Sequence, residues 1–178
     1  MSPILQTRRL TLCAWSRADC ARLHHICSDP RVMRFVGDGQ PWSVDQVRAF
    51  IDRERACGEQ HGYCRWALHH KADRVLIGFA GCVPAVDGAE IGWRLAAAYW
   101  GRGLATEAAK QVVHYGFASL DLPRITATVQ TLNLASIRVI EKVGLQLQSQ
   151  FWRGDRRLCR YSAPNPQAEC TSPHVIVD

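Results

Sequence analysis

The chain has 178 residues, of which 47% are hydrophobic and 21% are charged, and its formal net charge is +6. This length is typical of one domain, and the composition excludes a disordered or fibrous chain. No apolar run is long enough to span a bilayer, and the N-terminus lacks the basic and apolar regions of a secretory signal. We therefore expect a cytoplasmic protein that makes no membrane contact.

Apolar periodicity predicts strands and helices in the order β-α-α-β-β-β-α-β-α-β-β. The expected strands are residues 8–15, 63–69, 75–83, 90–95, 125–129, 146–152 and 156–162, and the expected helices are 17–26, 44–57, 104–120 and 134–143, with a further short helix at 31–36. Ser16 and Ser43 are predicted to cap the helices that follow them.

This order predicts an α+β fold in one domain over residues 1–162. We expect a mixed, mostly antiparallel central sheet of about seven strands flanked by about four helices. The tail over residues 163–178 carries several prolines and few large apolar residues, and it is expected to be disordered.

A glycine-containing turn after strand 90–95 carries the clearest chemical signal. Gly101 and Gly103 flank Arg102, and the turn runs directly into the helix that begins at Leu104. A helix N-terminus presents free N–H groups and partial positive charge, and glycine lets an anion approach the backbone closely. The pattern suits a diphosphate, although an ordinary bend is the plain alternative. No Gly-Lys-Ser/Thr follows, which excludes a P-loop.

Cysteines and charge are informative mainly for what they exclude. The eight cysteines form no Cys-x-x-Cys pair, so we expect reduced thiols. Cys20, His24 and Cys27 would share a helix face, but no fourth ligand is evident and no metal site is predicted. The positive charge is not concentrated in a dense Lys/Arg run, so nucleic-acid binding is not expected as the main function.

Two motifs together resemble the GNAT superfamily of acetyl-CoA-dependent N-acetyltransferases. They are the turn at residues 101–106 and the run at residues 133–145, about 25 residues apart. The opening at residues 5–10 is similar to the RimJ/RimL-like branch, which acetylates protein N-terminal amines and includes relatives acting on other amines. The resemblance covers about residues 4–162 and implies acetyl-CoA as co-substrate.

The resemblance also implies roles for individual residues. The strand end would pair its backbone with the pantetheine arm, the turn would take the diphosphate, Asn133 would bond the pantetheine, and Ser136 would lie near the thiol. The cofactor-binding residues so implied are Trp93, Arg94, Leu95, Trp100, Gly101, Arg102, Gly103, Leu104, Ala105, Thr106, Asn133 and Ser136.

The catalytic groups are harder to assign. Many family members carry a tyrosine that protonates the leaving thiolate, and its position here holds Ile140. Either Ser136 or a water serves instead, or the thiolate leaves unassisted. Glu90 is the candidate general base, with a solvated surface carboxylate as the alternative. Arg94, on the same strand face, is either an ion-pair partner or a substrate contact.

We therefore expect acetyl transfer to a primary amine, either a protein N-terminus or a small molecule, by direct attack in a ternary complex. The alternative is a non-catalytic acyl-CoA-binding or sensing module on the same fold. A homodimer is left open. The acceptor cleft is expected among residues 28–62, with Asp38, Trp42 and Tyr63 as candidates for its lining.

Overall fold

The N-terminal segment forms a hairpin where one strand over residues 8–15 was predicted. In the computed structural model, which describes residues 3–166, the two strands are β1 (Pro3–Gln6) and β2 (Leu10–Cys13). Thr7 closes the turn, because its N–H donates to the carbonyl of Leu10 (3.0 Å) and its hydroxyl accepts from the N–H of Leu10 (3.0 Å). The prediction was wrong by one strand because this turn has neither glycine nor proline to mark it.

Five α-helices and one short 3₁₀ turn follow the expected order. They are α1 (Asp19–Cys27), α2 (Pro30–Met33), α3 (Val44–His61), η1 (Ala97–Tyr99), α4 (Leu104–Ala118) and α5 (Leu134–Lys142). Ser43 caps α3 as predicted, in a capping box with Gln46. The predicted cap at Ser16 is wrong, because its N–H and hydroxyl both donate to the carboxylate of Asp19.

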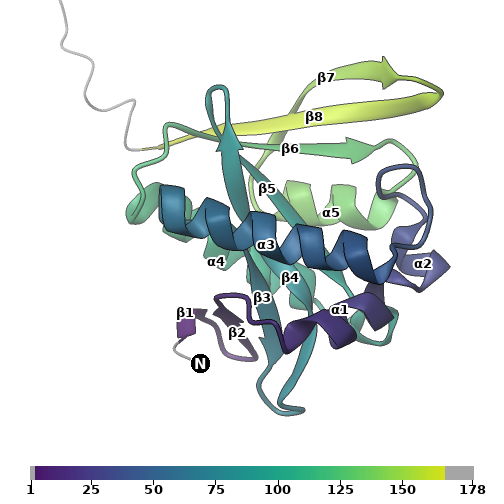
Figure 1. The fold of residues 1–178 in the computed structure, drawn as a ribbon. Coiled ribbons are helices and arrows are strands. Elements are labelled where there is room, and N and C mark those ends of the chain that lie inside the picture. Colours follow the sequence, from purple (N-terminus) through teal and green to yellow (C-terminus); the bar gives the residue numbers. More distant parts are fainter. Residues whose placement is uncertain (1–2, 167–178) are drawn as a thin grey trace, which may run out of the picture.

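The remaining strands complete one eight-stranded sheet. They are β3 (Arg65–His70), β4 (Val75–Ala85), β5 (Gly88–Leu95), β6 (Arg124–Gln130), β7 (Gln146–Arg153) and β8 (Arg156–Pro164). The strand order is β1-β2-β3-β4-β5-β6-β8-β7, and only β5 and β6 run parallel. The predicted α+β class and mostly antiparallel mixed sheet are confirmed, with one strand more than expected, and α2 corresponds to the short helix predicted at residues 31–36 beside the four main helices (Figure 1).

The C-terminal strand is longer than the predicted domain boundary allows. β8 continues to Pro164, which pairs with Arg124 of β6, whereas the boundary was predicted at residue 162. The predicted disorder of the tail falls mainly on residues 167–178, which lie outside the described residues.

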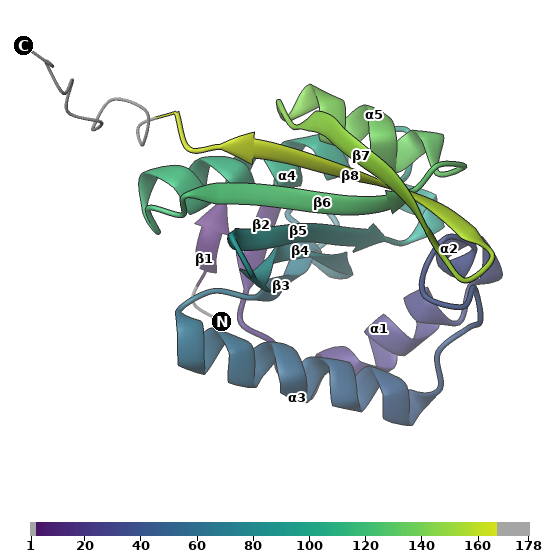
Figure 2. The same cartoon turned by 90° about the horizontal axis from the view of Figure 1, so that it is seen from above.

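Helices cover both faces of the sheet, as Figure 2 shows, with α1 and α3 on one side and α4 and α5 on the other. Each face has its own hydrophobic core. The α1–α3 side buries Trp15, Leu23, Phe50, Ile51 and Phe79, and the α4–α5 side buries Ile91, Leu95, Leu104, Ala108, Val112 and Ile140. Within residues 3–166 no helix is long and apolar enough to cross a membrane.

Candidate active site

The candidate site lies where β5 and β6 separate. The two strands pair only at Ala89 with Ile125 and at Glu90 with Thr126. Beyond these pairs the remaining edge of β5, up to Leu95, has no strand partner on that side. A free strand edge offers backbone N–H and C=O groups to an extended ligand. A cavity of about 710 Å³ opens beside this edge.

The cavity walls come from α2 and the segment after it, the end of β5, the turn before α4, and the first turns of α5. All cofactor residues implied by the family resemblance, with the exception of Arg102, line this cavity. The structure therefore brings together residues that lie up to about 40 positions apart in the sequence, as a splayed sheet edge requires.

The turn before α4 has the backbone conformation that its glycines predict. Gly101 and Gly103 have φ angles of 71° and 74°, in the left-handed region that favours glycine. Gly103 is the N-cap of α4 and has no side chain to cap the helix. The first bond within the helix runs from the N–H of Glu107 to the carbonyl of Gly103 (3.0 Å). The N–H groups of the preceding first turn therefore remain available to an anion at the cavity wall.

Trp100 fastens this turn to the end of β5. Its indole N–H donates to the carbonyl of Leu95 (2.8 Å), although the residue itself is largely exposed. This bond occupies the carbonyl of Leu95. Trp93, Arg94 and Leu95 all line the cavity, so the end of β5 lies beside an extended ligand placed there.

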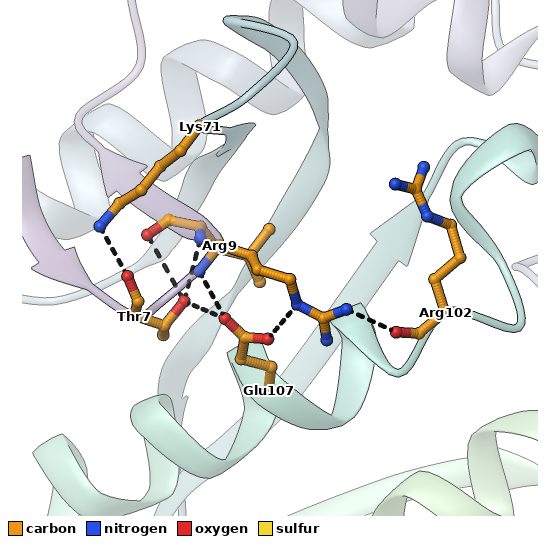
Figure 3. A network of polar contacts seen from close by, with 6 residues as sticks. Thr7, Arg9, Lys71, Arg102 and Glu107 are labelled. Atoms are coloured by element: carbon orange, nitrogen blue, oxygen red, sulfur yellow. Dashed lines mark hydrogen bonds and ion pairs between the residues drawn. The ribbon is translucent and has the colours of Figure 1, made fainter.

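Arg102 contributes its backbone rather than its charge. Its guanidinium carbon lies 5.2 Å from the ring centre of Tyr99, and its carbonyl accepts from Nη1 of Arg9 (3.0 Å). In Figure 3 the Arg102 side chain extends away from the Arg9 side chain that its carbonyl binds. The positive charge that the sequence suggested for the turn is therefore not directed into the cavity by this residue.

A polar network beneath the turn was not anticipated from the sequence (Figure 3). One carboxylate oxygen of Glu107 accepts from the Thr7 hydroxyl (2.6 Å) and the Arg9 N–H (2.8 Å), and the other accepts from Arg9 Nε (2.7 Å). Lys71 donates in turn to the carbonyl of Thr7 (2.6 Å). Partial burial would raise the pKa of Glu107, but these hydrogen bonds outweigh it and leave that pKa lowered. The only sequence signal was the opening at residues 5–10, to which no role was assigned.

The start of α5 forms the opposite wall. Asn133 is the N-cap, and its side-chain carbonyl accepts from the N–H of Ser136 (3.2 Å). Both residues line the cavity, and the Asn133 amide N–H groups and the Ser136 hydroxyl have no hydrogen-bond partner among residues 3–166. Ile140, one turn further on, is buried in the core on the α4–α5 side and cannot donate a proton.

The charges around the cavity have one sign. Its cationic lining residues are Arg31, Arg34, Arg94, Arg138 and Lys142, and no lining residue is acidic. Arg31 is paired with Asp29 (2.7 Å), whereas Arg138 and Lys142 stand one turn apart on α5 with no ion pair among residues 3–166. Such a lining attracts a polyanion and repels a polycation.

Glu90 lies outside this lining. It is half-buried at the last position of β5 that pairs with β6, on the same strand face as Gly92 and Arg94. Its carboxylate forms no ion pair with Arg94 or with any other residue in the described part of the chain, so of the two alternatives for Arg94 the ion pair with Glu90 is not formed. Of the residues suggested for the acceptor side, Trp42 stacks on Arg94, with 4.1 Å between the guanidinium carbon and the ring centre.

The cysteine and histidine cluster on α1 has other partners. Cys27 is buried and accepts a hydrogen bond from Arg94 (3.1 Å), while His24 lies 3.1 Å from the hydroxyl of Ser28. Across residues 3–166 no group of three or more potential ligands is placed to hold a metal ion.

A cleft between parted strands, free helix N–H groups behind two glycines, and a purely cationic lining fit the phosphates and the extended arm of coenzyme A. The fold and site thus define an acyl-CoA-dependent transferase. The sequence matches the family described as "Acetyltransferase (GNAT) domain" over residues 9–146. The chain belongs to the GNAT family and is an acetyl-CoA-dependent acyltransferase.

Individual relatives agree with this assignment. The chain is 34% identical over 149 residues to the uncharacterized N-acetyltransferase YoaA of Bacillus subtilis (strain 168), covering 82% of this chain and 84% of the relative. A GNAT-family acetyltransferase structure from Bacillus anthracis superposes with a TM-score of 0.80 and 25% identity, over 90% of this chain and 97% of that one. RimL, a ribosomal L7/L12 α-N-protein acetyltransferase, shares the fold with a TM-score of 0.77 at 16% identity, over 92% and 98% of the two chains.

Proposed function

We propose that this enzyme transfers the acetyl group of acetyl-CoA to a primary amine by direct attack in a ternary complex. The observation that carries the proposal is the cavity between the free edge of β5 and the N-terminus of α4, whose lining is cationic and never acidic. In the reaction the N–C bond forms and the C–S bond breaks. The amine loses one proton and the CoA sulfur gains one.

Cofactor binding is assigned to the residues that line the cavity. The backbone of Trp93, Arg94 and Leu95 would receive the pantetheine arm, and the side-chain amide of Asn133 would donate to it. The N–H groups that follow Gly101 and Gly103 would bind the diphosphate, with Trp100 holding the turn in place. The residues that supply these turn contacts are Trp100, Gly101, Arg102, Gly103, Leu104, Ala105 and Thr106.

Two residues are proposed as catalytic. Glu90 would remove one proton from the acceptor's ammonium group through one water, so that the neutral amine can attack, because an alkylamine is mostly protonated at neutral pH. Ser136 would donate a proton to the leaving sulfur. Ser136 lines the cavity and its hydroxyl has no hydrogen-bond partner in the described part of the chain, whereas the buried Ile140 has no proton to give.

The RimJ/RimL-like branch is proposed on the opening at residues 5–10 and on Trp100, which replaces the glutamine or arginine usual in the superfamily. Here the opening has a physical role, because Thr7 and Arg9 hold Glu107. A homodimer remains a prediction, to be tested by light scattering on a size-exclusion column.

A non-catalytic acyl-CoA-binding module is the second candidate, favoured by Ile140 at the position of the usual proton donor. The test is CoA release from acetyl-CoA over a panel of amines, with mass spectrometry of the products. CoA should be followed by chromatography, because eight cysteines would react with thiol reagents. Acetyl-CoA binding with no CoA release above the hydrolytic background would favour the module instead.

A further inference from the structure

Arg94 is a buried charge that no carboxylate of the described chain neutralises. The residue is 7% exposed, and its one hydrogen-bond acceptor within residues 3–166 is Sγ of Cys27, at 3.1 Å from Nη1. Burial raises the pKa of the Cys27 thiol more than the nearby guanidinium lowers it, so Cys27 stays neutral. A guanidinium has five N–H donors, so the other donors lack an acceptor there.

Aromatic rings cover part of this charge. The guanidinium carbon lies 4.1 Å from the ring centre of Trp42 and 5.2 Å from that of Phe79. Burial lowers the pKa of the Arg94 guanidinium, yet an arginine remains protonated at neutral pH. Cation–π contacts use the faces of the planar group and leave its N–H edge available for a bidentate partner.

The buried acid on α3 already has a partner. Glu54, 1% exposed, accepts from the backbone N–H of Arg65 (2.9 Å) and from its Nη1 (3.4 Å). Gly92 makes room for Arg65, since a Cβ there would lie 2.9 Å from its Nε. Arg65 therefore neutralises the charge of Glu54. The positive charge of Arg94 is left without an acidic partner among residues 3–166.

The anion that would neutralise Arg94 is not the diphosphate of CoA. Along β5 the side chains alternate, so Leu95 packs into the core beneath α4 while Arg94 points to the opposite face and meets Cys27 of α1. The diphosphate turn belongs to α4. Arg94 therefore lies on the side from which an acceptor would approach, on the same strand face as Glu90.

We propose that the acceptor amine carries a carboxylate on the same small molecule, as an amino acid does, and that Arg94 binds this carboxylate. The inference rests on the proposed N-acetyltransferase function and narrows its acceptor. A carboxylate accepts two parallel N–H bonds from a guanidinium edge, and Glu90 on the same face would serve the amine end. A polyamine would be repelled by this cavity, because every charged residue among the described lining residues is a cation. A protein N-terminus has no carboxylate close to its α-amino group unless one of its first side chains is acidic, so it would leave Arg94 without an anion.

The test compares matched acceptors with the full-length enzyme and saturating acetyl-CoA. The panel holds the standard L-amino acids, the carboxamide of each, spermidine, and tripeptide amides with neutral or acidic first residues. We expect at least one amino acid to exceed its carboxamide by about 10²-fold in kcat/KM, and R94M to reduce that ratio to near one. R94K keeps the positive charge but loses the two parallel N–H donors of the guanidinium, so it should reduce the ratio at least tenfold. This variant provides the test if R94M does not fold.

R55M is the matched control, because Arg55 is an exposed residue on α3 and is not part of the cavity lining. It should keep the wild-type ratio. Equal use of amino acids and their carboxamides, or a preference for spermidine or neutral tripeptide amides that R94M leaves unchanged, would overturn the carboxylate inference while acetyl transfer stands. Absence of CoA release with every amine would overturn the proposed function and this inference together.

Discussion

Arg9 and Glu107 form an ion pair, with 2.7 Å between Nε and Oε2, that joins the N-terminal hairpin to the first turn of α4. The same guanidinium donates through Nη1 to the carbonyl of Arg102 in the glycine turn (3.0 Å). A turn built on two glycines is conformationally permissive, so it needs outside contacts to keep its N–H groups aimed at the cavity. We infer that the hairpin preorganises the diphosphate site.

Replacing Glu107 with glutamine should weaken cofactor binding. Glutamine keeps the size but loses the charge that holds the Arg9 guanidinium. We expect the dissociation constant of CoA to rise about tenfold and the free energy of unfolding to fall by about 1 kcal/mol, because the pair is partly exposed. Calorimetric titration and urea unfolding measure the two effects. E59Q, which changes an exposed acid on α3, should show neither.

The effect of E107Q on stability should depend on pH. The folded-state pKa of Glu107 is lowered, so its contribution to stability is fully present above the unfolded pKa of about 4.3 and is lost as the pH falls through the folded value. The wild type should therefore exceed E107Q in stability at pH 7 and converge with it in acid. Urea unfolding of both proteins at pH 7 and at pH 3 measures this, and a constant difference across that range would refute the pKa assignment.

Substitution of Gly103 by glutamate should abolish CoA binding. The side chain would place bulk and negative charge at the helix N-terminus, where the left-handed φ of 74° also favours glycine. For the wild type, a ligand at 100 times its dissociation constant adds about 2.7 kcal/mol to stability, which is readily seen as a rise in melting temperature.

G154E is the matched control for G103E. Gly154 has a φ of 62°, lies in the turn between β7 and β8, and has open space around it. Both variants should lose stability through backbone strain, but only G103E should lose the rise in melting temperature with CoA. A normal response in G103E would remove the diphosphate site from the α4 turn.

The parts of this site that could be predicted from the residues themselves are those that depend on short-range sequence patterns. Gly101 and Gly103 are marked by their own neighbours, because turn chemistry acts over three or four residues, whereas Asn133 was implied only by the family resemblance and its role as N-cap of α5 was not predicted. The Thr7–Glu107 bond joins residues 100 positions apart, and no periodicity reports such a contact. Alternation along β5 placed Arg94 and Glu90 on one face, but only the contacts of Arg94 with Trp42 and Cys27 show that it pairs with no acid among residues 3–166.

The described cysteines should differ widely in reactivity toward iodoacetamide in the native protein. Burial raises the pKa of Cys64 and of Cys82 to about 12, so very little thiolate forms at pH 8. Cys20 is partly exposed and should react first. Peptide mass mapping against time measures the order. After denaturation without reductant all eight cysteines should react, and a native disulfide would contradict the expected reduced state and cytoplasmic location.

Glu90 offers the most direct test of the chemistry. It lies at the last position of β5 that pairs with β6, half-buried, with its carboxylate unpaired among residues 3–166 and on the face that carries Arg94. E90Q keeps the size and removes the basicity, so we expect kcat to fall by about 10²-fold near neutral pH. Affinity for acetyl-CoA should change little, because Glu90 does not line the cofactor cavity. Activity should recover in part at high pH, where more of the amine is already deprotonated.

D87N is the control for E90Q, since Asp87 is an exposed acid three residues earlier, in the turn before β5, and should leave the rate unchanged. The pH–rate profile separates the roles of the carboxylate. A base gives a loss that shrinks as pH rises, whereas a purely structural carboxylate gives a loss independent of pH together with a lower melting temperature. If E90Q keeps wild-type turnover from about pH 6 to pH 9, Glu90 is not the general base, and solvent or a group on the substrate accepts the proton instead.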